Sequence, residues 1–128
     1  MLAERIAERR AGVGDPRALV GEVRRALLLV PLDGGGLWAA ESGGVRWICA
    51  FTDEAALARF AAARGAGGQE WEFARIRGAR LLDEVVPGLG APAGVAVNVA
   101  DGDGSMLFPP VGGIVPDTAA VTGAEGER

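Results

Sequence analysis

The stretch RWICAFTDEAALARFAAARG, residues 46–65, decides the fold because it joins a strand to a helix through a single short turn. In its first part, Trp47, Cys49 and Phe51 alternate with smaller residues over a run that favours β structure. This alternation predicts a strand that carries its three large side chains on one face.

The second part of this stretch changes to helical periodicity. Leu57, Phe60 and Ala61 recur at the spacing of one helix face. We expect Thr52 to cap the first turn, the two acidic residues after it to favour the positive end of the helix dipole, and Gly65 to end the helix. The stretch is therefore a packing unit, and it contains no obvious catalytic group.

Upstream of this unit, Asp15 followed by Pro16 predicts the start of a helix, with a capping side chain and a proline at the first helical position. The apolar face of this helix comprises Leu19, Val23, Ala26 and Leu27. Residues 28–32 then form an apolar run of strand length. Pro31 within it favours a position at a sheet edge or at the end of the strand.

Glycine-rich turns connect the next elements. They separate residues 28–32, 37–41 and 46–51, which we interpret as an antiparallel meander. Residues 71–75 predict another strand, and residues 94–100 and 106–108 predict a terminal hairpin. A short third helix is predicted from the apolar residues Leu81, Leu82, Val85 and Val86. The predicted fold class is α+β, with an antiparallel sheet of about five or six short strands and two to three helices packed on it.

The length of 128 residues is that of one ordinary domain. We expect residues 1–14 to form a loosely held arm, residues 15–115 a single domain, and residues 116–128 a flexible tail. We predict one hydrophobic core, which contains Trp47, Phe51, Leu57, Phe60, Leu82 and Val97.

The charge and composition limit the partners that we expect. All basic residues are arginine, histidine and tyrosine are absent, and the net charge is −4. A net acidic chain is a poor candidate for nucleic-acid binding, so we interpret Arg75, Arg77 and Arg80 as a solvated rim. No apolar run approaches the length of a membrane helix and the N-terminus is charged, so we expect no membrane insertion and a cytoplasmic location.

Several kinds of catalytic site are excluded by the residue types. Without histidine, neither a Ser/His/Asp nor a Cys/His site can be built, and one cysteine cannot assemble a structural zinc site. Cys49 in an apolar strand favours a reduced core thiol. Asp101 and Gly102 start a segment that superficially resembles a calcium loop, but Gly112 stands where the bidentate acid is needed, so a turn is favoured. We therefore predict no enzyme, no cofactor and no metal site.

Four acidic residues remain as possible partners in acid/base chemistry, and each has a simpler explanation as a turn, edge or cap residue. They are Asp33, Glu41, Asp53 and Glu54. An enzyme that uses only carboxylates is the third hypothesis, and it requires two acids that converge in a cleft.

Two regions are candidate partner-binding surfaces. Trp38 follows a glycine turn in a short strand, where a large ring can remain partly exposed. The apolar, proline-rich strap of residues 106–114 either closes the domain's own core or docks a partner through Phe108 or Ile114. The predicted partner-binding residues are Trp38, Phe108, Pro109, Pro110 and Ile114.

The order of elements resembles the SseB N-terminal domain family, in particular its short, single-domain actinobacterial members. The resemblance rests on Val30 and Pro31 at a strand end, AFTDEAALARF at residues 50–60, the leucine pair in the third helix and GVAVNVADGDGSMLFPP at residues 94–110. It implies a compact α+β fold, a family without an established enzyme activity, and no catalytic residues to transfer. The chain differs from the longer members, which have a second C-terminal domain, and in having Asn98 followed by valine where the family has proline.

These observations lead to two functional hypotheses. The first is a non-enzymatic protein interaction or accessory module with a protein partner of unknown identity, and with self-association possible. The alternative is a small-ligand binding domain, with a pocket between the sheet and the helices that carry Leu57, Phe60 and Leu81.

Overall fold

Seven strands form the centre of the molecule, in a computed structural model that describes residues 2, 6, 15–34, 36–65, 71–116 and 118–121. The strands are β1 (Leu27–Asp33), β2 (Gly36–Leu37), β3 (Ala39–Ser42), β4 (Val45–Ala50), β5 (Phe73–Arg77), β6 (Ala93–Val97) and β7 (Met106–Phe108). The helices are α2 (Pro16–Arg25), α3 (Glu54–Ala63), α4 (Gly78–Arg80), the π-helical turn η1 (Leu81–Val85), α5 (Val86–Gly88) and the 3₁₀ turn η2 (Gly102–Gly104). The predicted α+β class is confirmed.

The strands form two hydrogen-bonded sheets rather than one. One has the order β2-β1-β5 and the other the order β3-β4-β6-β7. All pairs are antiparallel except β4 and β6, which run parallel, with Ile48 opposite Val95. The expectation of a single antiparallel sheet is wrong at this pair because the chain between β4 and β6 passes through α3, β5 and the third helix, a connection long enough to return β6 in the same direction.

A single bridge joins the two sheets. The backbone N–H groups of Leu29 and Phe51 each donate to the other residue's carbonyl at 2.8 Å. Beyond this bridge, the chain passes from β1 through β2 into β3. Between β2 and β3, the Trp38 N–H donates to the Pro31 carbonyl at 2.8 Å, which keeps this segment beside β1. Pro31 thus lies inside β1, close to the point where β1 changes its partner from β5 to β2.

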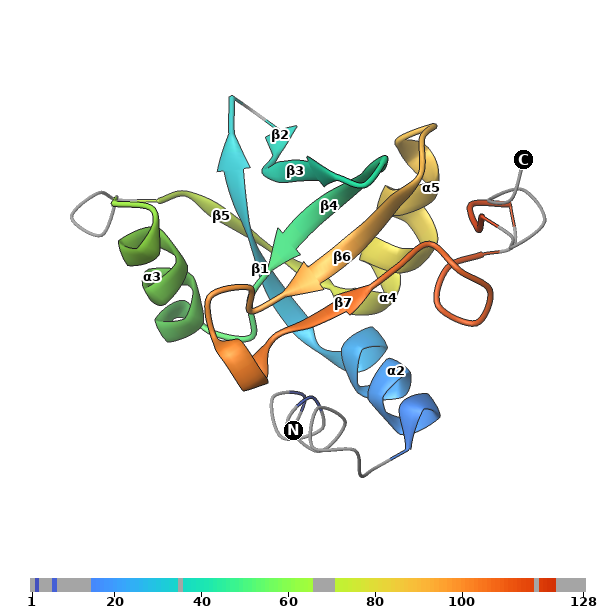
Figure 1. Ribbon diagram of the computed structural model, residues 1–128, viewed down its shortest axis with the longest axis horizontal. Coiled ribbons are helices and arrows are strands. Elements are labelled where there is room, and N and C mark those ends of the chain that lie inside the picture. The colour runs from blue at the N-terminus through green and yellow to red at the C-terminus, as the bar shows by residue number, and fades with distance from the viewer. Residues whose placement is uncertain are drawn as a thin grey trace.

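Helices lie on both sides of the strands, as Figure 1 shows, with α3 on one side and the helix of residues 78–88 on the other. Alternate strand residues therefore enter two separate clusters. Leu28, Ile48 and Val95 belong to the cluster that includes α2 and the 78–88 helix. Leu29 and Phe51 belong to the cluster around α3. The expectation of one core is wrong because the strands are covered on both faces.

The six predicted core residues are distributed over these two clusters. Phe51, Leu57 and Phe60 are buried against α3, and Leu82 and Val97 are buried on the opposite face. Trp47 is only half-buried, and its indole lies over Gly94, where an added Cβ would come within 2.7 Å of the ring.

The first helix packs against the third through a very close contact. Asp15 caps α2 as expected, since its Oδ1 accepts from the Arg17 N–H at 3.0 Å. A Cβ at Gly78 would lie 1.7 Å from the Val23 carbonyl oxygen, so only glycine fits where the two helices cross. Arg24, the residue after Val23, forms an ion pair with Asp83 of the third helix. The hydrogen bond from the Arg24 guanidinium lowers the pKa of the Asp83 carboxyl.

The α3 helix starts one residue later than expected. Its N-cap is Asp53, whose Oδ1 accepts from the Ala56 N–H at 2.8 Å, and not Thr52. Thr52 is instead held by Asn98: the Thr52 N–H donates to Asn98 Oδ1, and Asn98 Nδ2 donates to Thr52 Oγ1, both at 3.0 Å. Thr52 is therefore held by tertiary hydrogen bonds to Asn98, and its neighbour Asp53 provides the local cap of α3.

The ends of the chain contribute to the core wherever they are described. Leu2 and Ile6 are buried in the cluster of α2, while the rest of the predicted arm, residues 1–14, lies outside the described residues. Ala119 and Ala120 pack against the same cluster, and the end of the predicted tail, residues 122–128, lies outside the description. Among the described residues, no helix has both the length and the apolarity needed to span a membrane.

Phe60 is the central residue of the α3 cluster. Its ring contacts those of Trp38, Phe51 and Trp71 at centroid distances of 5.4, 5.1 and 6.0 Å. We predict that Phe60→Ala lowers the free energy of unfolding by about 3 to 5 kcal/mol through lost burial and a cavity. Urea denaturation measures this loss. A matched truncation at the exposed Leu107 should cost less than about 0.5 kcal/mol, and a loss below about 1 kcal/mol at Phe60 would contradict the assigned packing.

Asn98 combines a buried amide with a left-handed backbone, at φ 52° and 2% exposure. We predict that Asn98→Ala costs about 3 kcal/mol, since it removes both side-chain bonds and places a Cβ residue in the left-handed region. Asn98→Gly should cost about 1 kcal/mol less, because glycine tolerates this backbone. Equal losses for the two variants, measured by thermal and urea denaturation, would show that the backbone carries no strain.

Candidate functional site

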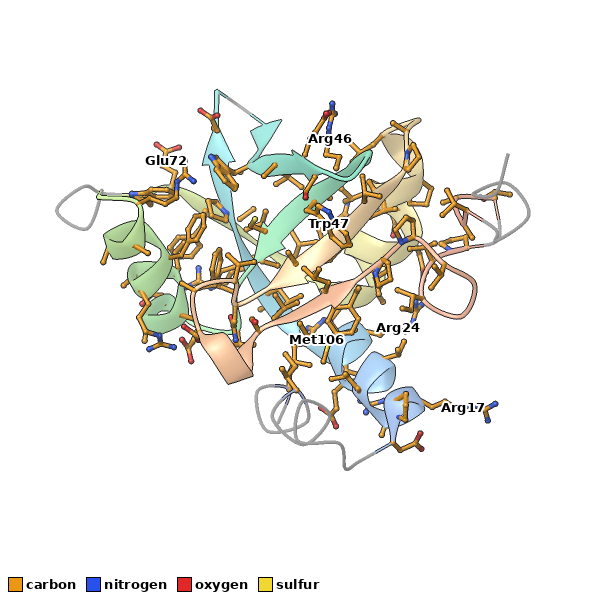
Figure 2. The ribbon with its side chains drawn as sticks, in the orientation of Figure 1. Arg17, Arg24, Arg46, Trp47, Glu72 and Met106 are labelled. Atoms are coloured by element: carbon orange, nitrogen blue, oxygen red, sulfur yellow. The ribbon has the colours of Figure 1, made fainter. Side chains whose placement is uncertain are left out.

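An open groove of about 410 Å³ lies where β3, the β1–β2 turn and the end of the third helix meet. We call it the β3 groove. Its lining residues are Asp33, Leu37, Trp38, Ala39, Glu41, Arg46, Ile48, Val85 and Leu89. Figure 2 shows Arg46 close to the β2–β3 segment and to α5, at the end of the molecule far from α2.

The groove exists because the helix layer ends before the sheet does. The 78–88 helix covers β4 and β6, whose residues Ile48 and Val95 are buried beneath it. β3 is the outermost strand of its sheet, and Ala39 on it is only half-buried. The uncovered part of the sheet is therefore the floor of the groove, and Val85 and Leu89 form the helical wall.

The irregular third helix positions this wall. In η1 the Val86 N–H donates to the Leu81 carbonyl, five residues back, and the following Pro87 has no N–H to donate. Val86 is buried in the core while its neighbour Val85 is half-buried at the groove. Leu89, just after the helix, stays 37% exposed. Leu89 therefore adds apolar surface to the rim of the groove.

Trp38 also lines the groove, and its ring packs on the α3 side of the strands. Its ring packs edge-on against Phe60 at 5.4 Å, and the Arg64 guanidinium lies 4.8 Å from its ring centroid. Its backbone N–H bonds to Pro31, so both ring and backbone are fixed. Trp38 therefore contributes to the lining of the groove while its ring belongs to the α3 cluster.

Two of the three charged residues that line the groove form an ion pair with each other. Arg46 donates to Glu41 at 3.2 Å across the β3–β4 pair, where the two residues stand directly opposite each other. Asp33, exposed at the end of β1, makes no ion pair with any residue in the described ranges. The described lining residues therefore carry a net charge of −1, from two acids and one base.

Of the predicted partner-binding residues, Trp38 alone lines this groove. Phe108 is 2% exposed and packs in the α2 cluster, and Pro110 is buried. Neither can be an exposed anchor, because the β6–β7 hairpin folds Phe108 onto the inner face, opposite Val95. Ile114 is half-buried against the same cluster, and Pro109 is half-buried. On β7 the exposed apolar residue is Leu107, at 54%.

Sequence patterns missed the helical side of the groove. The apolar pattern predicts Val85 on the core face of the third helix and gives no role to Leu89. The available signal was an apolar residue directly after the helix-ending Pro87 and Gly88, where a core position is not expected. Leu57, Phe60 and Leu81, beside which a pocket is expected, are all buried in the two clusters, and none of them lines the hollows described here.

The other charged residues considered in the sequence make contacts within the fold. Both carboxylate oxygens of Asp101 accept from Arg59, at 2.7 and 2.8 Å, so the segment that resembled a calcium loop is a turn. Arg77 donates to the Arg25 carbonyl at 2.7 Å, and Arg75 lies over the Phe73 ring. Within the parts of the chain that the structure describes, no group of three His, Cys, Asp or Glu side chains could hold a metal ion.

Other hollows occur elsewhere on the surface. One of about 420 Å³ lies between Leu2, the end of α2 and the turn at Thr52 and Asp53. Another, of about 300 Å³, lies between Pro87 and the segment Thr118 to Val121. Both adjoin segments outside the described residues, so the β3 groove is the candidate site that the described residues define most fully.

Cys49 is a core thiol in the structure. It is 4% exposed, and burial raises its pKa to about 11, an effect that the nearby Arg64 cation partly opposes. At pH 8 only about one thiol in a thousand is then ionised, which makes the group a poor nucleophile. This is the arrangement expected for packing.

We predict that Ellman's reagent labels folded protein at pH 8 at least about tenfold more slowly than protein unfolded in guanidinium. The raised pKa also predicts that the thiol's contribution to stability is complete below its ordinary value of 9.0 and declines as the pH rises to about 11. Unfolding free energies over this range should fall more in the wild type than in Cys49→Ala. Rapid labelling of the folded protein would contradict the burial of the thiol.

No family model, no curated protein and no solved structure matches this chain.

Proposed function

We propose that the protein is a non-enzymatic interaction module that docks a protein partner in the β3 groove. The observation that carries this proposal is the meeting of an edge strand, a fixed tryptophan and an exposed leucine around one open hollow of about 410 Å³. Rigid aromatic residues beside apolar side chains are the usual anchors of protein interfaces. Exposed edge strands are common sites of peptide binding.

The chemistry of the chain agrees with this proposal. Histidine is absent from the sequence, and the thiol of Cys49 is held in its neutral form by burial. Asp53 is a helix cap, and Glu41 is paired with Arg46, so neither is placed as a free acid or base. The resemblance to the SseB N-terminal domain family, which has no established enzyme activity, supports the same reading.

A second candidate function is the binding of a small ligand in the same groove. Its volume of about 410 Å³ lies within the range of small-molecule sites. Asp33, Glu41, Arg46 and Leu89 at its border are all exposed, however, so the hollow is open along the sheet edge. An open groove of this kind suits a chain segment better than an enclosed small molecule, and we therefore rank the interaction module first.

Affinity capture with a tagged protein from an extract of the source organism tests this proposal. We predict that a partner is captured in stoichiometric amount by the wild type and that Leu89→Glu reduces its recovery at least about tenfold, since it places a charge on the apolar wall. Leu107→Glu is the matched control: it introduces the same charge at an exposed leucine on β7 and should leave recovery unchanged.

Native mass spectrometry of the same preparations separates the alternatives. A bound small molecule without a protein partner would favour the ligand-binding function. A partner that is recovered equally by all three proteins would place its binding site outside the β3 groove. Equal melting temperatures of the variants ensure that a lost partner does not reflect unfolding.

A further inference from the structure

We infer that the occupant of the β3 groove is an extended segment of a partner protein that pairs with the free edge of β3 and carries a basic side chain beside an apolar one. This inference rests on the proposed function and adds the chemistry and the conformation of the bound segment. Three observations support it: the open edge of β3, the alternation of residues along it and the net negative charge of the described lining residues.

The first observation concerns the backbone. β3 pairs with β4 on one side and has no partner strand on the other within the described part of the chain. An edge strand has outward N–H and C=O groups at alternate positions, and an added strand satisfies them. The strand reads AAES, with neither the proline nor the lysine that natural edges use against pairing. Its two alanines are small enough to leave the approach open.

The second observation concerns which side chains the added strand would meet. Ala39 stands opposite Ile48 and Glu41 opposite Arg46, and all four line the groove. Along a strand, residues two apart share a face. An added strand would therefore place one side chain beside Ala39, toward the apolar wall at Leu89, and the side chain two positions along beside Glu41.

The third observation concerns charge. Asp33 and Glu41 are acidic lining residues and Arg46, which donates to Glu41 at 3.2 Å, is basic, so the described lining of the groove carries a net charge of −1. A lysine or arginine of the partner would balance this charge, and an acidic side chain would be repelled. The chain's net charge of −4 acts in the same direction over a longer range.

A second copy of this chain fits the groove less well than a basic segment does. Its own β3 contains an acid and no base, so pairing two β3 strands would add a carboxylate to a lining that is already net acidic. Both copies also carry the net negative charge. Self-association through β3 is therefore an outcome that the experiment must be able to detect.

Selection from a random peptide library displayed on phage tests the inference with the full-length protein as bait. The expected sequences combine an apolar residue with a lysine or arginine two positions away, as residues on one face of a strand require. Synthetic versions of the selected peptides should bind at least about tenfold more weakly to Leu89→Glu than to the wild type. Replacing a central residue of the peptide by proline, which removes an amide donor, should abolish binding.

Charge reversal is the most specific measurement. Asp33→Arg should weaken binding of the basic peptides at least about tenfold and improve binding of the same peptides with glutamate in place of the basic residue. Glu54→Arg is the matched control, with the same change of net charge at an exposed site on α3, and it should leave this preference unchanged. Hydrogen exchange with the peptide bound should show new protection of β3 amides.

Several results would overturn the inference. They are selected peptides with helical spacing or acidic residues, binding that tolerates the central proline, or protection of β3 that rises with protein concentration when no peptide is present. If affinity capture still yields a partner that depends on Leu89, the interaction function stands and only the form of the bound segment is wrong. If neither capture nor selection depends on Leu89, both proposals fail.

Discussion

Three consecutive residues at the end of β4 hold the architecture together, because they form hydrogen bonds to two different parts of the chain. Phe51 exchanges two backbone bonds with Leu29 of β1, and Ala50 and Thr52 bond to Asn98 after β6. The first contact joins the two sheets, and the second fixes the start of α3 against the end of β6. Burial strengthens these bonds, since an unmade bond in this place leaves a polar group without water. The left-handed backbone of Asn98 is tolerated because its amide satisfies Thr52.

The groove follows from this arrangement. The bridge between Leu29 and Phe51 is followed along β1 by the bond from Trp38 to Pro31, so Trp38 enters β3 with its ring directed to the α3 side. On the opposite face, the third helix approaches α2 so closely at Gly78 that a Cβ cannot fit. The first residue of the third helix, Gly78, thus lies against α2, and the far end of the helix, at residues 85–89, does not cover β3. Val85 and Leu89 then line an open hollow beside β3.

The proposed interaction surface is consistent with the remaining chemistry of the chain. The one thiol is buried on the α3 side with a raised pKa, Asp53 caps α3, and Glu41 pairs with Arg46. What stays free at the groove is an edge strand, two apolar walls and one negative charge. Main-chain pairing supplies affinity in such sites, and the side-chain pockets and charge supply selectivity. The surface outside the groove needs no further explanation, because isolated exposed apolar residues such as Leu107 are common on folded proteins.

The sequence by itself determined the elements whose signals are local. The alternation in residues 46–51, the Asp15 and Pro16 helix start and the terminal hairpin were all correctly predicted, since strand periodicity, capping and turn chemistry depend on neighbouring residues. Tertiary structure decided what depends on distant residues. It selected Asp53 over Thr52 as the cap because Asn98 binds Thr52, made β4 and β6 parallel, and divided the core in two. It also buried Phe108 and exposed Leu89, because burial depends on which elements pack together, and the sequence pattern of a single segment does not contain that information.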